Sequence, residues 1–391
     1  MHLSIFNPSN YQRAGHIIMP WQAIQEKTGL HPQEIILRDS NGQCLPYQID
    51  SMDPNDASLD TLAFSLLQPV QPGPADYAAA SDSVSIERGS ATIEHAVEMP
   101  LVVTPETTNE QERVVGLTNS RISAWFNLLP TTGQLEANWY AGAATSIRLD
   151  DLEMLEAFKA INNWQGHDPE KRCIQIEQIQ LLHPKGDPAI DLFNRPYQLL
   201  AHSAGPVRAT ITLASSPFEY SFYTDDTIPE RDEVRQLQLY RILSLYSGAD
   251  YIIEDLFLKD VSTSRVIGTT EDDHIGFVAR YFAYMDLGFD PSIYQYPEAP
   301  QWFAIGSPWE PRPAYGFATD APTVILAYPY QDPYASAHKH KRFSWQTLPC
   351  YSARCLHVFM RGLTEDWAPR VGRSWHELID KTLKAQLVVN D

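Results

Sequence analysis

Short apolar runs separated by polar and turn-forming residues recur along most of the chain. In residues 83–88 (SVSIER) and 208–215 (RATITLAS), apolar side chains occupy alternate positions. This alternation predicts β-strands with one face in the core and the other face in water. Gly, Pro, Asn or Asp separates most of the runs, which is typical of antiparallel strands joined by turns. We therefore expect a predominantly β protein.

Two stretches depart from this pattern and repeat apolar residues at helical spacing. Residues 149–164 (LDDLEMLEAFKAINNW) predict a helix with Asp150 or Asp151 as its N-cap. Residues 374–389 (SWHELIDKTLKAQLVV) predict a second helix near the C-terminus. We expect few helices beyond these two.

The chain of 391 residues exceeds the size at which single hydrophobic cores usually stop growing, so two domains are expected. Residues 1–80 read as a small β-sandwich, in which DSNG at positions 39–42 predicts a hairpin turn. Residues 68–83 are rich in Pro, Ala and Ser and predict a linker. Residues 83–391 are then expected to form a larger antiparallel β-sandwich.

Composition and charge narrow the class of protein. The chain is 43% hydrophobic and 20% charged, as in a soluble globular protein, and its formal charge of -20 argues against nucleic acid as a partner. We find no secretory signal and no apolar run long enough to span a membrane, so no membrane partner and a cytoplasmic location are expected. The four cysteines lack CxxC spacing and are expected to be reduced, with a Cys350–Cys355 disulfide as the alternative.

Six segments carry a resemblance to a known family, which are FNPSNYQRAGHIIMPW (6–21), ILRDSNGQCLPYQID (36–50), LAFSLLQPV (62–70), LTNSRISAWFNLLPTTGQL (117–135), SAGPVRATITL (203–213) and LYRILSLYSGADYIIEDLFL (239–258). They resemble the β-domains that follow the catalytic barrel in family 38 α-mannosidases. It implies an all-β fold, in which a small N-terminal β-sandwich is followed by a large galactose-mutarotase-like antiparallel β-supersandwich. Sugar epimerases, polysaccharide lyases and accessory domains of glycoside hydrolases use this fold. The family's nucleophile and zinc ligands lie in the preceding barrel, so the resemblance assigns no catalytic residue here.

The densest group of cationic and titratable side chains is HKHKR at residues 338–342. An H-x-H pair on a strand can supply two ligands of a metal site, but no H-x-x-E-H or H-x-x-x-H partner motif accompanies it. A cationic rim that binds an anionic sugar is a second interpretation, and a solvated loop is a third. We expect no metal, because the H-x-H pair lacks such a partner motif. We expect no nucleotide cofactor, because neither G-x-G-x-x-G nor a P-loop motif occurs.

Two further stretches could share a sugar site with this group. The first is an acidic turn in which a carboxylate and an imidazole could divide general acid and base roles. The second is an aromatic, loop-like stretch that could stack on sugar rings. Candidate catalytic residues are Glu271, Asp273, His274, His338 and His340. Candidate substrate-binding residues are Arg280, Trp302, Trp309, Glu310, Arg312, Lys339, Arg342 and Trp345.

The expected function is action on, or binding of, a carbohydrate in a concave sheet face, and an acidic sugar is one form of that ligand. An epimerase, lyase or glycoside hydrolase is one alternative. The other is a non-catalytic carbohydrate-binding or assembly module that partners a separate enzyme. An enzyme should show a cleft in which a carboxylate or Tyr lies near a His or Arg, whereas a binding module should show aromatic side chains without convergent titratable groups. Whether the chain forms a homo-oligomer stays open.

Overall fold

The computed structural model describes residues 1–72, 82–89, 100–103, 114–128, 144–154, 174–176, 180–182, 190–191, 195–223, 232–268, 278–286, 292–295, 301–306, 313–321, 323–328, 340–347, 350–361, 367–380 and 382–388. The described strands form five sheets whose pairings are all antiparallel. Within these residues there are two short α-helices. The predicted all-β fold, with a small sandwich followed by a larger one and few helices, is confirmed.

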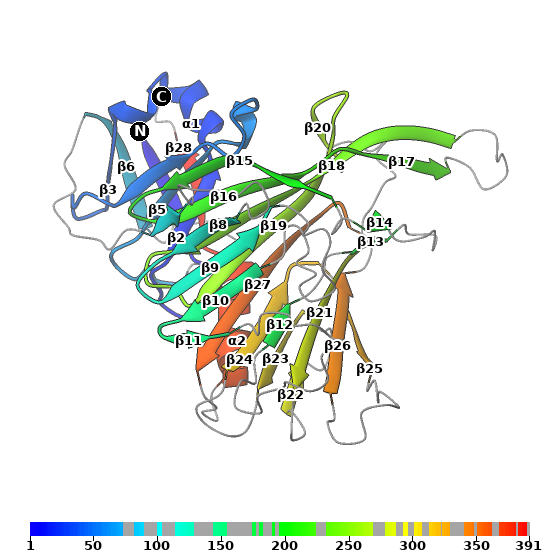
Figure 1. The fold of residues 1–391 in the computed structure, drawn as a ribbon. Helices are drawn as coiled ribbons and strands as arrows, with labels where there is room; N and C mark the ends of the chain where they lie inside the picture. The colour runs from blue at the N-terminus through cyan, green and yellow to red at the C-terminus, as the bar shows by residue number, and fades with distance from the viewer. Residues whose placement is uncertain are drawn as a thin grey trace.

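The largest sheet, which we call the central sheet, has ten strands and runs through the middle of the molecule (Figure 1). Its path is β15-β16-β18-β19-β27-β24-β23-β22, with β17 paired to β18 and β20 paired to β19. The strands are β15 (Tyr197–Ala204), β16 (Arg208–Ser215), β17 (Phe218–Tyr223), β18 (Asp232–Tyr246), β19 (Tyr251–Asp260), β20 (Arg265–Val266), β22 (Ser292–Gln295), β23 (Trp302–Gly306), β24 (Pro313–Thr319) and β27 (Ser352–Arg361).

Two further sheets complete the larger sandwich. A five-stranded sheet packs its apolar side chains onto one face of the central sheet and forms the main hydrophobic core with it. It contains β7 (Leu101–Val103), β8 (Val114–Thr118), β9 (Ile122–Asn127), β10 (Ala144–Leu149) and β11 (Leu152–Glu153). A six-stranded sheet contains β12 (Ile174–Ile176), β13 (Gln180–Leu182), β14 (Ile190–Asp191), β21 (Val278–Asp286), β25 (Thr323–Tyr328) and β26 (His340–Thr347).

The small sandwich is built from a four-stranded and a three-stranded sheet with a separate apolar core between them. The first contains β28 (Lys384–Val388), β1 (His2–Phe6), β6 (Asp82–Arg88) and β3 (Ile35–Arg38), in that order. The second contains β2 (His16–Pro20), β5 (Thr61–Ser65) and β4 (Tyr47–Asp50), next to helix α1 (Trp21–Thr28) and the 3-10 turns Pro32–Glu34 and Ala57–Leu59. The predicted domain boundaries stay a prediction, and we note that β6 and β28 both pair with β1.

The helix predicted over residues 374–389 is wrong in most of its length. Helix α2 spans Trp367–Trp375, a π-helical turn follows at His376–Asp380, and residues Lys384–Val388 form strand β28. This strand pairs with β1, and its Ala385 and Leu387 pack against the core of the small sandwich. Tertiary pairing with an available strand edge has overridden the local helical preference.

The helix predicted at residue 149 does not begin there. Strands β10 and β11 form a hairpin whose turn holds Asp150 at a positive φ of 54°. Ile147 and Leu149 alternate into the main core, which is the period of a strand rather than a helix. Residues 155–164 of the predicted helix lie outside the described residues.

Strand β16 differs from its prediction in an informative way. Its alternation predicts one wet face, yet every residue of the strand is buried. Ala209, Ile211 and Leu213 face the main core, while Arg208 and Thr210 are covered on the opposite side. The small sandwich therefore covers a face of the central sheet that the sequence pattern assigns to solvent.

A buried hydrogen-bonded ion pair joins the small sandwich to the central sheet. Arg208 Nε donates to Asp50 Oδ2 at 2.8 Å, and the two side chains are 3% and 0% exposed. Gln48 Oε1 accepts from the backbone N–H groups of Val207 and Arg208, at 3.0 Å each. A Cβ at Gly205 would lie 2.6 Å from Gln48 Oε1, so glycine allows this close approach. We call these residues the Arg208 clamp.

A second connection joins the five-stranded sheet to the turn between β18 and β19. Asn119 Nδ2 donates to the carbonyl groups of Tyr246 and Ala249, at 2.7 and 2.9 Å. Arg121 Nη1 donates to Asp250 at 2.9 Å, and Arg370 from α2 reaches the same carboxylate. The segments that resemble the mannosidase β-domains thus contribute residues that join the layers of this fold.

The Arg208 clamp yields a stability prediction. Asp50→Asn leaves a buried guanidinium without its counter-charge, so we expect the free energy of unfolding in denaturant to fall by about 3–5 kcal/mol. The control is Glu87→Gln, which breaks the exposed Arg38–Glu87 pair and should cost less than about 1 kcal/mol. Equal effects of the two substitutions would contradict this account of the clamp.

Candidate functional site

A cavity of about 300 Å³ lies where the small sandwich, the central sheet and the C-terminal segment meet, and we call it the junction pocket. The segment before β2 contributes Arg13 and Gly15, and β2 contributes His16 and Ile18. Tyr246 ends β18, while Tyr251 and Ile253 come from β19 and Arg354 from β27. The C-terminal segment supplies the remaining lining residues, which are Ser374, Glu377, Leu378, Thr382 and Leu383.

Aromatic rings form one wall of this pocket. His16 stacks on Tyr246 with 4.6 Å between ring centroids, and Tyr246 lies 6.0 Å from Tyr251. The tight turn between β18 and β19 places the two tyrosines at the ends of adjacent antiparallel strands. Burial, with a smaller contribution from Arg208, lowers the pKa of His16 to about 4, so its imidazole is neutral near pH 7. Burial also raises the pKa of Tyr251 and keeps its hydroxyl protonated.

The cations that line the pocket already have partners. Arg354 donates to both oxygens of Asp255, from Nε at 2.6 Å and from Nη2 at 3.1 Å. That carboxylate raises the pKa of Arg354 further. Arg13 donates to the carbonyl of Glu377 at 2.8 Å and to Asn7 Oδ1 at 3.3 Å. The positive charge in the pocket is thus largely used to hold the protein together.

Two polar groups of the pocket are placed to meet a ligand. Glu377 Oε1 accepts from the Tyr11 hydroxyl at 2.7 Å, whereas its Oε2 has no hydrogen-bond partner within the described residues. The Tyr251 hydroxyl likewise has none in the described part of the chain. Glu377 lies in the π-helical turn His376–Asp380, and such turns are frequent at functional sites. Tyr251 and Glu377 are partly exposed, so a ligand or water that enters the pocket can reach both groups.

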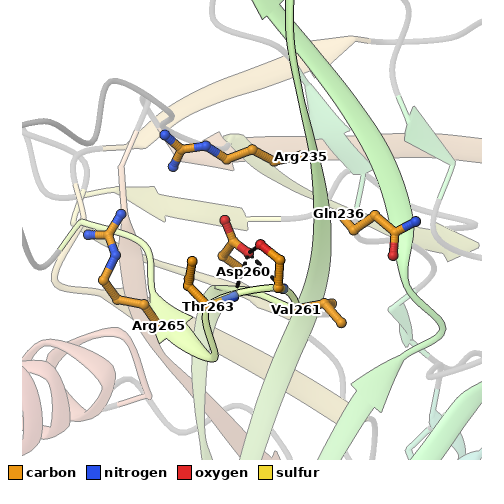
Figure 2. Close-up of a pocket in the computed structure, with 7 residues that line it drawn as sticks. Arg235, Gln236, Asp260, Val261, Thr263 and Arg265 are labelled. Carbon is orange, nitrogen blue, oxygen red and sulfur yellow. Dashed lines mark hydrogen bonds between the residues drawn. The ribbon is translucent and has the colours of Figure 1, made fainter.

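A second cavity, of about 440 Å³, lies beside the turn that joins β19 to β20. We call it the turn pocket, and Figure 2 shows the residues that line it, Arg235, Gln236, Asp260, Val261, Ser262, Thr263 and Arg265. The guanidinium groups of Arg235 and Arg265 lie on the same side of the turn in this view, and Asp260 lies nearer the turn. This pocket is separate from the junction pocket, since the two share no residue.

A chain of four titratable side chains crosses the inner face of the central sheet. Arg241 Nε donates to Glu254 Oε1 at 2.6 Å, His357 Nε2 lies 3.1 Å from Glu254 Oε2, and the Tyr315 hydroxyl lies 2.8 Å from His357 Nδ1. All four are buried next to the main core. Burial raises the pKa of Glu254, but Arg241 and His357 outweigh it and lower that pKa to about 2. A carboxylate, His, Arg and Tyr thus converge in the interior, but none of them lines the junction pocket or the turn pocket, so the cleft expected of an enzyme stays a prediction.

Some of the candidate residues predicted from the sequence are on described strands. Arg280 is on β21, and His340, Arg342 and Trp345 are on β26, which pairs with β21 along its length. Asp286 is opposite His340, and Tyr281 is opposite Trp345. The backbone therefore brings these four candidates onto two neighbouring strands.

Trp302, on β23, is partly buried, and its indole packs where a Cβ at Gly372 of α2 would lie 2.9 Å away. It fills the space between the central sheet and α2. The other candidates lie outside the described residues, so their placement in one cleft stays a prediction; these are Glu271, Asp273, His274, Trp309, Glu310, Arg312, His338 and Lys339.

The predictions on metal ligands and on a disulfide concern residues that the structure describes only in part. Among them, no three His, Cys, Asp or Glu side chains are grouped closely enough to hold a metal ion. Cys44, Cys350 and Cys355 are free thiols, so the alternative Cys350–Cys355 disulfide is not formed. No helix in the described part is long and apolar enough to cross a membrane.

The junction pocket was missed by the sequence analysis. Tyr246 and Tyr251 were within the resemblance segments but were interpreted only as strand residues, and Glu377 was placed in a predicted helix. The two tyrosines directly flank the four-residue turn SGAD (247–250), and this pattern could have predicted that they lie close together. Nothing local in the sequence connects His16 or Arg13 to residues about 360 positions away, such as Glu377.

No family model matches the chain, and no curated protein matches it in sequence. Its fold is similar to an α-mannosidase from Enterococcus faecalis V583, with a TM-score of 0.48, 10% identity, and coverage of 99% of this chain and 46% of that one. A family 38 glycosyl hydrolase from Enterococcus faecalis gives a TM-score of 0.47, 9% identity, and coverage of 99% and 47%. A 4-α-glucanotransferase from Thermococcus litoralis gives a TM-score of 0.37 and 10% identity, with coverage of 68% and 40%.

The chain thus spans less than half the length of the first two of these structures. Family 38 is also the family that the sequence segments resemble. Because the TM-scores lie below 0.5, we infer function from the side chains of this chain rather than from these structures.

The buried chain around Glu254 yields a pH prediction. Its pKa is lowered on folding from 4.5 to about 2, so the stabilisation is present above about pH 4.5 and is lost as the pH falls toward 2. We expect the parent to exceed Glu254→Gln in unfolding free energy near pH 6, and the difference to shrink steadily below pH 4.5. Urea unfolding of both proteins across this range measures it. A difference that does not depend on pH would contradict the assignment of Glu254 as a buried carboxylate.

Proposed function

We propose that the protein binds a carbohydrate in the junction pocket. The observation that carries this proposal is the combination in one cavity of an aromatic wall with two polar groups, the Tyr251 hydroxyl and Glu377 Oε2, that have no hydrogen-bond partner among the described residues. Tyrosine rings can pack against the C–H face of a sugar, while a hydroxyl and a carboxylate bind its hydroxyl groups. A volume of about 300 Å³ is at the lower end for ligand pockets, which favours one or two sugar rings.

The charges of the pocket favour a neutral sugar over an acidic one. Arg354 is held by both oxygens of Asp255, and Arg13 is held by Asn7 and the carbonyl of Glu377. A ligand carboxylate would compete with these partners and would also approach the charge of Glu377. A neutral sugar needs neither change, because its hydroxyl groups can donate to Glu377 and accept from Tyr251. For the junction pocket we therefore propose a neutral sugar. The acidic sugar expected beside residues 338–342 is a separate prediction.

Catalysis is the second candidate function, and the buried chain Arg241–Glu254–His357–Tyr315 is the observation that favours it. A carboxylate that orients an imidazole, which in turn contacts a phenol, is an arrangement suited to proton transfer. In that case the protein would be an epimerase, lyase or glycoside hydrolase. Otherwise it would be a binding module that acts beside a separate enzyme. We also propose a cytoplasmic location, in line with the absence of a disulfide between Cys350 and Cys355.

The binding proposal is tested with Tyr251→Phe and Glu377→Gln. We screen neutral hexoses and disaccharides, hexuronic acids and hexose phosphates by thermal shift, and measure the best ligand by calorimetry. Loss of one hydrogen bond in Tyr251→Phe should weaken binding about 3- to 10-fold, and loss of the charge in Glu377→Gln by about 10-fold or more. The stability of Tyr251→Phe should stay the same or rise, because the Tyr251 hydroxyl has no partner in the described part of the chain.

Tyr351→Phe is the matched control, since Tyr351 is 43% exposed and does not line the pocket. It should bind like the parent. Full retention of affinity in both pocket variants would remove the junction pocket as the site. Conversion of any sugar in the screen, followed by NMR and lost in Glu254→Gln, would favour the enzyme over the binding module.

A further inference from the structure

The turn pocket is built by three strands whose backbone pairing fixes two arginines at its sides. Arg235 is on β18 and Arg265 is on β20, and both strands pair with β19. Asp260, at the end of β19, is opposite Leu237 on one side and Arg265 on the other. The N–H of Val261 donates to the carbonyl of Gln236 at 2.9 Å and holds the turn against β18. The geometry of the pocket therefore depends on main-chain hydrogen bonds rather than on mobile side chains.

The turn itself is held by its own carboxylate. Asp260 Oδ1 accepts from the N–H of Ser262 at 2.8 Å, from the Ser262 hydroxyl at 2.5 Å and from the N–H of Thr263 at 3.2 Å. Burial raises the pKa of Asp260, and these hydrogen bonds outweigh it and lower the pKa, so the group is ionised near pH 7. Ser264 has a positive φ of 55°, which a non-glycine residue adopts only when its surroundings require it.

The balance of charge and donors in this pocket favours an anion. Two guanidinium groups face one carboxylate, and that carboxylate is 4% exposed and uses Oδ1 on the turn. Each guanidinium has five N–H donors, so one arginine can contact another residue and a ligand at the same time. Figure 2 shows both guanidinium groups on one side of the turn, with the Gln236 side chain directed to the other. The Thr263 side chain on the turn offers a further hydroxyl donor.

We propose that the turn pocket binds an oxyanion, in the form of a phosphate or carboxylate group on a small molecule. Planar guanidinium groups bind such groups through paired N–H···O bonds, which lysine cannot reproduce. The proposal is independent of the sugar site, because the two pockets share no residue. It also gives the chain of net charge -20 a local site at which an anion is attracted rather than repelled.

The test is titration of the full chain with inorganic phosphate, sulfate, acetate and a hexose phosphate at constant ionic strength, followed by ³¹P NMR or calorimetry. We expect saturable phosphate binding at millimolar concentrations. Arg265→Ala and Arg235→Ala should each weaken it by about 10-fold or more, and Arg265→Lys by a smaller factor. Tighter binding of hexose phosphate than of inorganic phosphate would identify a phosphorylated small molecule as the ligand class, and tighter binding of acetate would identify a carboxylate.

Two controls keep the result interpretable. Arg148→Ala removes an exposed arginine that pairs with Glu153 in the five-stranded sheet, and it should bind phosphate like the parent. Thr263→Val removes one hydroxyl without changing the charge and should weaken phosphate binding about 3-fold. This variant still tests the proposal if an arginine variant unfolds. Absence of saturable binding in the parent would overturn the proposal. An equal loss of phosphate affinity in Arg148→Ala and Arg265→Ala would also overturn the proposal, because it would show that only the net charge of the protein matters.

Discussion

The buried contact between Arg208 and Asp50 determines how the two sandwiches meet. A guanidinium that is 3% exposed would be strongly unfavourable without a counter-charge, and Asp50, from the small sandwich, supplies it. Gln48 adds hydrogen bonds to the backbone of the same strand, so the contact specifies position as well as charge. Lys259, on β19 and two strands away from β16, repeats the arrangement and contacts Asp53 and Asp56 at 3.1 and 2.9 Å. Polar groups, rather than an apolar interface alone, thus set the register between the sandwiches.

This contact also explains why a pocket exists at the junction. Arg208 lies under the ring of Tyr246, with 5.8 Å between the guanidinium carbon and the ring centroid, and it donates to the Tyr246 hydroxyl at 3.3 Å. Tyr246 in turn supports the imidazole of His16. The aromatic wall is therefore attached directly to the clamp that joins the sandwiches. A change in the relative position of the two sandwiches would therefore directly alter the packing of the Tyr246 and His16 rings.

The class of fold could be predicted from the sequence because it depends on local alternation. DSNG formed the expected turn, in which Asp39 Oδ1 accepts from the N–H groups of Asn41 and Gln43 and Gly42 adopts a φ of 79°. Strand β28 could not be predicted, because its helical spacing is overridden by a partner almost the whole chain away. The burial of Thr210 and the assembly of the junction pocket were unpredictable for the same reason, since both require knowledge of which surfaces meet.

The pairing of β1 with β28 has a consequence for how the chain folds. His2 is opposite Val388, and both strands lie side by side in Figure 1. Contacts between residues so distant in sequence carry a large loop-closure cost and form late. During synthesis, the edge of β1 must wait until the last part of this sequence leaves the ribosome, with its N–H and C=O groups open to other strands. The early part of the chain is therefore the part most exposed to mispairing, and a chaperone that shields strand edges would act there.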